Sequence, residues 1–221
     1  MPGEVTIYSN TDDGYVSNTG TTWATVRDAN TGSTVAGLGG SSTTAVRSSA
    51  TTARGTTTSV ITRSFMGFDT SGINHIPKLA ELHLYGLTYG YSDVIVVKSN
   101  WTGILSTADF DSIVGWDGTN SDGAGGGTEV NNVTFYSNQV STWDTTDYNR
   151  ITLTQQALAD IAGEGELKCC IIDHDSDLRD IAASSASNYT GFYYANYIGT
   201  TRDPKLVIQT QDDSVFFGAN F

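Results

Sequence analysis

The sequence predicts an all-β protein, a single jelly-roll β-sandwich with one short helix. Glycine is abundant (24 residues), proline is scarce (3 residues), and Thr and Ser are plentiful, a composition that suits twisted sheets joined by tight turns. The length of 221 residues favours one large sandwich over two small domains. A segment at residues 63–85 alternates apolar and polar residues as strand, turn and strand.

The 63–85 segment is the clearest pair of strands. Phe65 and Phe68 precede a turn, and Leu82 and Leu84 follow it, so these four side chains are expected in the core. Alternation of this kind is typical of a strand with one face in a core and the other in water. No spacing within the segment suggests catalysis.

The other strands follow from the same reasoning. The continuous apolar runs at 94–99 and 167–172 predict strands that are buried on both faces. Further strands are expected at residues 5–8, 14–16, 23–27, 60–68, 79–87, 130–136, 148–153, 191–197 and 205–209.

Residues 30–59 consist almost entirely of Thr, Ser, Gly, Ala and Val, with Arg47 and Arg54 as the only charged residues. A segment of this composition buries little, so we expect one strand at about 43–47 and a mobile loop after it. The sandwich domain is therefore assigned to residues 1–210, including this loop at about 30–59, and residues 211–221 are assigned to a C-terminal docking tail.

One helix is expected. Thr154 is a suitable N-cap, residues 155–162 are good helix formers, and Gly163 is suited to end the helix in the left-handed conformation. Leu158 and Ile161 give this helix a narrow apolar stripe, as in a lid or connector on a β fold.

The formal net charge of −13 argues against nucleic acids and anionic membranes as partners, because both repel an acidic protein. Solubility, cation binding and a high-salt environment all remain compatible with this charge. The adjacent Cys169 and Cys170 lie in an apolar run, point to opposite faces of the expected strand and predict buried free thiols. The N-terminal residues lack the features of a secretory signal, and no segment has the length of a membrane span, which predicts synthesis in the cytoplasm or export by another route.

Several segments, taken in order, resemble the DNRLRE-type carbohydrate-binding modules. They are 13–16 (DGYV), 63–73 (RSFMGFDTSGI), 80–85 (AELHLY), 94–101, 151–154 followed by the expected helix, and 203–208 (DPKLVI). The similarity spans most of residues 5–210, although the DNRLRE string itself is absent. The resemblance implies a β-sandwich (jelly-roll) fold and, more weakly, a glycan ligand.

The densest group of carboxylates in the sequence consists of Asp173, Asp175, Asp177 and Asp180. Alternating carboxylates can wrap Ca²⁺, which takes six to eight oxygen ligands, so this loop is a candidate calcium site. The alternative is a solvated acidic turn at the end of a strand. Asp117 and Asp122, in a glycine-rich loop, are weaker candidates for the same role.

Aromatic residues supply the candidate glycan site. Aromatic faces stack on the apolar face of a pyranose, and tyrosine hydroxyls supply hydrogen bonds. The candidate residues are Tyr89, Tyr91, Trp101, Tyr193 and Tyr197. The alternative for these rings is packing in the sandwich core.

Catalysis has little support in the sequence. His75, His83 and His174 lie apart, no Ser or Cys has a recognisable nucleophile setting, and Asp69 with Asp173 is a carboxylate pair only by default. The chain is therefore expected not to be an enzyme.

The expected function is that of a structural or binding protein on the surface of a virion or similar assembly, as a capsid decoration, head-fibre or tail protein of a bacteriophage. Such a protein is made in the host cytoplasm and reaches the exterior on lysis. Its expected partners are capsid or other virion proteins, copies of itself and, as a further option, polysaccharide. The aromatic tail, with Phe216, Phe217 and Phe221, is expected to dock on a partner because an exposed tail of this kind favours aggregation. The alternative is a carbohydrate-binding module of an extracellular polysaccharide-degrading or cell-surface protein.

Overall fold

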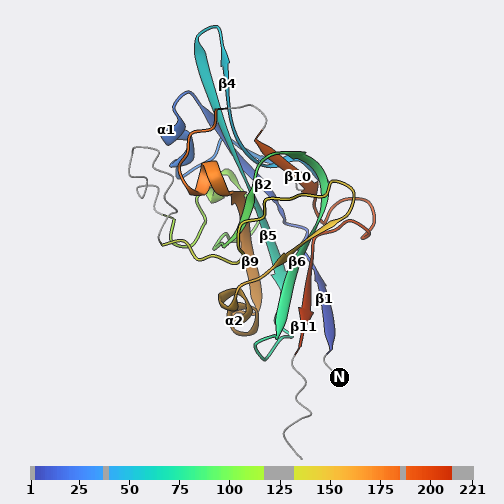
Figure 1. The fold of residues 1–221 in the computed structure, drawn as a ribbon. Helices are drawn as coiled ribbons and strands as arrows, with labels where there is room; N and C mark the ends of the chain where they lie inside the picture. Colours follow the sequence, from blue (N-terminus) through green and yellow to red (C-terminus); the bar gives the residue numbers. More distant parts are fainter. Residues whose placement is uncertain (1–2, 37–39, 117–131, 185–187, 211–221) are drawn as a thin grey trace, which may run out of the picture.

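The computed structural model describes residues 3–36, 40–116, 132–184 and 188–210 (Figure 1). These residues form an all-β sandwich, as the sequence predicted, in which eleven strands belong to one antiparallel sheet accompanied by a few short helices. The long hairpin of β4 (Ser41–Ala53) and β5 (Thr56–Asp69) projects from one end of the molecule (Figure 1). Strands β1 (Glu4–Tyr8) and β11 (Lys205–Gln209) lie side by side at the opposite end.

One layer contains four strands in the order β1, β11, β6 and β8. Their bounds are β1 Glu4–Tyr8, β11 Lys205–Gln209, β6 Leu79–Gly90 and β8 Tyr148–Thr152. Strand β6 is long enough to pair with β11 and β8 through one half and with β10 through the other.

The second layer contains β3, β2, β5, β9 and β7 in that order. Their bounds are β3 Thr34–Ala36, β2 Gly14–Gly20, β5 Thr56–Asp69, β9 Glu166–Asp173 and β7 Val94–Lys98. Strands β4 (Ser41–Ala53) and β10 (Tyr189–Tyr193) link the layers, because β4 pairs with β5 and β10 while β10 also pairs with β6.

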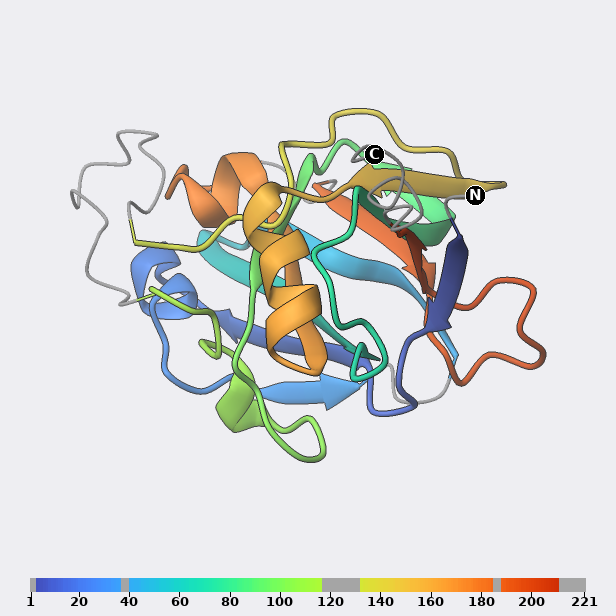
Figure 2. The same cartoon turned by 90° about the horizontal axis from the view of Figure 1, so that it is seen from below.

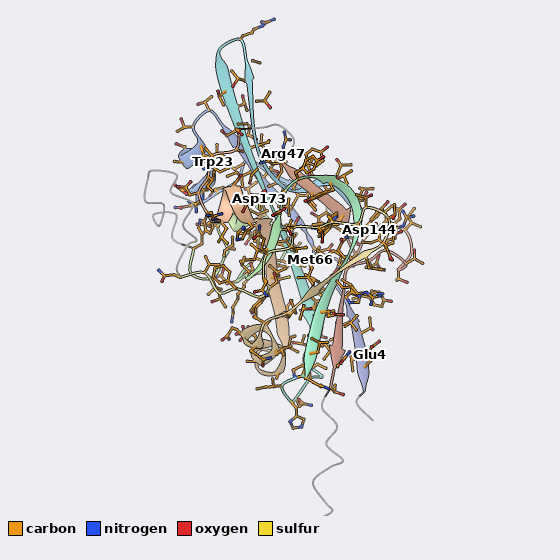
Figure 3. The ribbon with its side chains drawn as sticks, in the orientation of Figure 1. Glu4, Trp23, Arg47, Met66, Asp144 and Asp173 are labelled. Atoms are coloured by element: carbon orange, nitrogen blue, oxygen red, sulfur yellow. The ribbon has the colours of Figure 1, made fainter. Side chains whose placement is uncertain are left out.

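The main core fills the space between the two layers. Leu82 and Leu84 of β6 face Met66 and Phe68 of β5, and all four side chains are buried. Met66 lies near the middle of the sandwich (Figure 3). Helix α2, Gln155–Gly163, covers one end of the sandwich and contributes Ala157, Leu158 and Ile161 to this core (Figure 2).

A second apolar cluster covers the outer face of the β2–β5–β9–β7 layer. Phe65 belongs to this cluster, whereas Phe68 belongs to the main core, so β5 is buried on both faces. The expectation that one face of this strand lies in water is therefore wrong. The covering residues come from helix α1 (Trp23–Arg27) and from a long connection after β7, and include Val26, Trp101, Leu105 and Phe110.

The two cysteines lie on opposite faces of β9, as their adjacency predicted. Cys169 belongs to the main core and Cys170 to the second cluster. Both thiols are free and buried, and burial raises the pKa of Cys169 to about 12 and that of Cys170 well above its usual value. The thiolate forms that react with oxidants are therefore strongly disfavoured.

The Thr- and Ser-rich segment forms a hairpin where a long loop was expected. Strands β4 and β5 pair up to Ala53 and Thr56, and the hairpin turns at Arg54 and Gly55 with φ values of 50° and 82°. Positive φ at both turn positions is the geometry that matches the twist of two-residue hairpins. The β-branched threonines favour this extended ribbon although it buries few side chains.

Three further elements differ from expectation. Residues Trp23–Arg27, expected as a strand, form helix α1, whose Val26 packs in the second cluster. The described part of the expected strand at 130–136 makes only isolated bridges, such as Phe135 with Val97. Thr154 caps α2 as predicted, but the left-handed glycine lies two residues later than expected, at Gly165 with φ of 72°.

Candidate glycan-binding groove and tyrosine patch

A group of tyrosines gathers on the outer face of the β11–β6–β8 sheet. Tyr85 of β6 and Tyr148 of β8 lie opposite each other in register, and their rings meet edge to face at 5.2 Å between centroids. Tyr193 packs edge to face on Tyr85 at 5.7 Å, and Tyr197 packs on Tyr193 at 4.6 Å. We call these four residues, together with Arg202 and Lys205, the tyrosine patch.

Arg202 occupies the centre of the tyrosine patch. Its guanidinium carbon lies 5.1 Å from the ring centroid of Tyr85, 4.9 Å from that of Tyr193 and 5.8 Å from that of Tyr197. Nη1 of Arg202 also donates a hydrogen bond of 2.8 Å to the hydroxyl of Tyr193. The rings hold the cation in place by cation–π contact without neutralising it.

Lys205 extends the positive charge of the patch along β11. Its Nζ lies 4.1 Å from the ring centroid of Tyr148, whose hydroxyl donates to the carbonyl oxygens of Thr201 and Asp203 at 3.0 and 3.1 Å. Burial raises the pKa of Tyr148 to about 12, so this hydroxyl stays neutral.

Arg150 lies on the same outer face, opposite His83 in register. Within the described residues, Arg150, Arg202 and Lys205 have no carboxylate within salt-bridge distance. The carboxylates of Asp147 and Asp203 lie close enough to help raise the pKa of the neighbouring Tyr148, so the three cations share this face with acidic groups.

An open groove of about 720 Å³ adjoins the tyrosine patch and shares Tyr148 with it. Its lining combines aromatic, amide, hydroxyl and charged groups: Val140, Thr142, Trp143, Asp144, Thr145, Tyr148, Asn149 and Arg150. Asp144 lies beside β6, on a part of the molecule well separated from Asp173 (Figure 3). Open grooves with aromatic walls and several hydrogen-bonding groups suit elongated polar ligands.

Asn149 and Gly86 fix the wall of the groove. The side-chain amide of Asn149 accepts from the backbone N–H of Asp144 at 2.7 Å and donates to its carbonyl oxygen at 2.8 Å. Gly86 allows the Trp143–Asp144 segment to approach β6, because a Cβ at this position would lie 1.8 Å from the carbonyl oxygen of Asp144. The backbone N–H of Gly86 donates to the backbone carbonyl oxygen of Asp147 at 3.1 Å.

The structure brings together only part of the predicted aromatic set. Tyr193 and Tyr197 belong to the tyrosine patch, whereas Tyr89 and Tyr91 form a separate pair with their rings 5.6 Å apart. Tyr91 is 80% exposed, and Trp101 is buried in the second cluster, where the core-packing alternative holds.

Sequence reasoning missed Tyr85, Tyr148, Arg202 and Lys205. Their convergence depends on the register between β6, β8 and β11, which pairs Tyr85 with Tyr148 and Lys205 with His83. The alternation in β6 and β8 could have placed Tyr85 and Tyr148 on outer faces, but not beside each other.

The predicted calcium loop does not form one site. Asp177 is fully buried and accepts from Nε and Nη2 of Arg63 at 2.8 and 2.7 Å, while its backbone carbonyl oxygen accepts from Nε of Arg27 at 2.6 Å. Both carboxylate oxygens of Asp177 are therefore occupied by a guanidinium. Charge-assisted pairs of this bidentate kind are strong and directional.

The other three carboxylates of this loop take separate partners. Asp173 accepts from the hydroxyl of Ser92 and from the backbone N–H of Ser176, and burial raises its pKa to about 6. Asp175 is exposed and contacts His174 at 2.7 Å, and Asp180 accepts from Nε1 of Trp23 at 2.9 Å. Among the described residues, no group of three or more His, Cys, Asp or Glu side chains is placed to hold a metal ion.

The remaining predicted positions are a carboxylate pair and residues outside the described part of the chain. Asp69 lies at the end of β5, in register with Glu166 at the start of β9, whereas Asp173 ends β9, so this carboxylate pair does not form. Asp117 and Asp122, and the tail residues Phe216, Phe217 and Phe221, lie outside the described residues.

No protein-family model matches the chain, and no curated protein matches it significantly. Within the part of the chain that the structure describes, no helix has the length and apolar character needed to cross a membrane.

Proposed function

We propose that this chain is a non-enzymatic β-sandwich that binds acidic glycans through the tyrosine patch and the adjoining groove. The observation that carries the proposal is Arg202, a cation held among three tyrosine rings without a carboxylate partner among the described residues.

The chemistry of the site suits a sugar that carries a carboxylate or sulfate. Tyrosine rings pack on the C–H face of a pyranose, while the guanidinium of Arg202 can bind an anionic group through paired N–H donors. Tyr197 is 36% exposed and offers part of its ring to a ligand. The exposed carboxylate of Asp144 in the groove supplies an acceptor for sugar hydroxyls.

We expect Arg202→Ala to weaken binding to polygalacturonate at least tenfold, because a charge-assisted hydrogen bond contributes about 1.5–3 kcal/mol. Affinity gel electrophoresis in gels containing polygalacturonate or a neutral β-glucan measures this. The wild-type protein should be retarded by the acidic polymer, and the retardation should decrease with added salt.

Arg54→Ala is the matched control, because it removes the same charge from the tip of the exposed β4–β5 hairpin and should bind like the wild type. Wild-type protein that migrates identically in all gels would refute the glycan proposal. So would an Arg202→Ala variant that keeps the wild-type melting temperature and full retardation.

We propose a virion or similar large assembly as the setting of this binding module. The proposal rests on the acidic charge and the aromatic tail, and on the meeting of Gly3 and Thr210 at one end of the molecule, where their backbone groups lie 2.9 Å apart. A module joined to an assembly at that end leaves the hairpin at the other end exposed (Figure 1).

Deletion of residues 214–221 tests the assembly role. We expect the full chain to elute from a size-exclusion column as a trimer or larger species and the truncated chain as a monomer, because three phenylalanines would be lost from the contact. Truncation at 218 keeps Phe216 and Phe217 and serves as the graded control. A full chain that is already monomeric would contradict this part of the proposal.

A further inference from the structure

Two buried aspartates lie near each other where the turn before β2 packs against the segment before β11. Asp13, at the start of β2, is 0% exposed, and Asp203, just before β11, is 5% exposed. Oδ1 of each carboxylate is buried and has no hydrogen-bond partner among the described residues. The other side-chain atoms that share this condition belong to neutral Ser, Thr and Trp groups.

The surroundings of the two aspartates come from the 9–13 turn, from Ala195 and from the segment at 203–204. Oδ2 of Asp13 accepts from the hydroxyl of Ser9 and from the backbone N–H of Ala195, both at 2.9 Å. The backbone N–H of Ser9 donates to the carbonyl oxygen of Pro204 at 3.0 Å. This hydrogen bond holds the 9–13 turn against the segment that contains Asp203. Each aspartate thus has a fixed backbone and one unsatisfied oxygen.

Keeping both buried carboxylates ionised without a positive partner costs free energy. The pKa of Asp13 is raised to about 7, chiefly by burial and to a smaller extent by the charges of Asp203 and Asp12, although the hydrogen bonds from Ala195 and Ser9 lower it. Burial also raises the pKa of Asp203. A positive partner relieves this cost, and no Lys or Arg side chain forms an ion pair with either aspartate among the described residues.

We propose that Asp13 and Asp203 bind a Ca²⁺ ion through their free Oδ1 atoms. Calcium takes carboxylate and backbone carbonyl oxygens, and the polar turn before Asp13 is a source of the latter. The ion joins the 9–13 turn to the 194–204 segment and thereby fixes the backbone that presents Tyr197 and Arg202. This site differs from the acidic loop at 173–180, where Arg63 already neutralises Asp177.

Thermal unfolding of the full chain at pH 7.5 tests the site. We expect 1 mM Ca²⁺ to raise the melting temperature by about 5 °C over protein in EDTA, and Asp13→Asn and Asp203→Asn each to abolish this shift. Asp175→Asn, which removes an exposed carboxylate of the acidic loop, is the matched control and should keep the full shift.

Tyrosine-sensitised Tb³⁺ luminescence gives a measurement on the wild-type protein, in case a variant fails to fold. The charge of Asp13 contributes to the raised pKa of Tyr194, so this ring is close enough to sensitise an ion at the site. Luminescence that Ca²⁺ displaces supports the proposal. Wild-type protein with neither luminescence nor a Ca²⁺-dependent melting shift would overturn it, as would a shift that persists in both variants. Since the readouts are stability and luminescence, this result is independent of glycan binding.

Discussion

Asp177→Ala is expected to lower the free energy of unfolding by about 3–5 kcal/mol, because it leaves a fully buried guanidinium without its carboxylate. Arg63 is 0% exposed and lies between the rings of Phe110 and Trp116, at 4.2 and 4.1 Å from their centroids. Its other donors reach the backbone carbonyl oxygens of Phe110 and Arg27, at 2.9 and 3.0 Å. Water cannot replace Asp177 in so closed an environment. Urea unfolding monitored by tryptophan fluorescence measures the loss.

Asp175→Ala is the control for this prediction, because Asp175 lies in the same helical turn but is exposed, and exposed ion pairs contribute little. The double variant Arg63→Met with Asp177→Leu should recover most of the stability, since replacing a buried pair with apolar residues removes both charges. If Asp177→Ala unfolds at the same urea concentration as Asp175→Ala, the buried pair has no structural role.

Gly86→Ala is expected to have the second largest effect, a loss of about 3 kcal/mol in the free energy of unfolding together with loss of glycan retention. The added Cβ would lie 1.8 Å from the carbonyl oxygen of Asp144 and 2.9 Å from Nε1 of Trp143. Because the closest atom belongs to the backbone, the segment that forms the groove wall must move away from β6. Urea unfolding and affinity electrophoresis measure the two consequences.

Gly163→Ala is the matched control, since a Cβ there meets nothing within 4 Å and the residue is the last of helix α2. This change should stabilise the protein by about 0.5–1 kcal/mol. A Gly86→Ala variant with wild-type stability and retention would show that the close approach of Asp144 to β6 is not needed for the groove.

The sequence predicted the strands well where apolar runs were long. It predicted the burial of a strand less well where the second apolar cluster covers its outer face. The runs at 94–99 and 167–172 correspond to β7 and β9, whose side chains enter both apolar clusters. Alternation in β5 suggested a wet face, but its polar positions Arg63 and Ser64 are buried and paired. A polar side chain in a strand indicates solvent only when no partner lies across from it.

At the candidate sites, too, local sequence patterns did not show which distant residues become neighbours in the fold. Sequence spacing suggested that Asp173, Asp175, Asp177 and Asp180 share one cation. The fold instead brings Arg63 of β5 onto Asp177, and Arg27 of α1 near both Asp177 and Asp180. The tyrosine patch instead joins residues from β6, β8, β10, β11 and the segment before β11.

By itself, the sequence determined the fold class, most strands, the capped helix and the opposite faces of Cys169 and Cys170, because these depend on local periodicity and composition. The tertiary structure decided which charges are neutralised and which stay free. Asp177 forms an ion pair with the buried Arg63, whereas Arg202, Asp13 and Asp203 form no ion pair among the described residues. Pairing of charges depends on strand register and on contacts between residues more than one hundred positions apart, which no local pattern encodes.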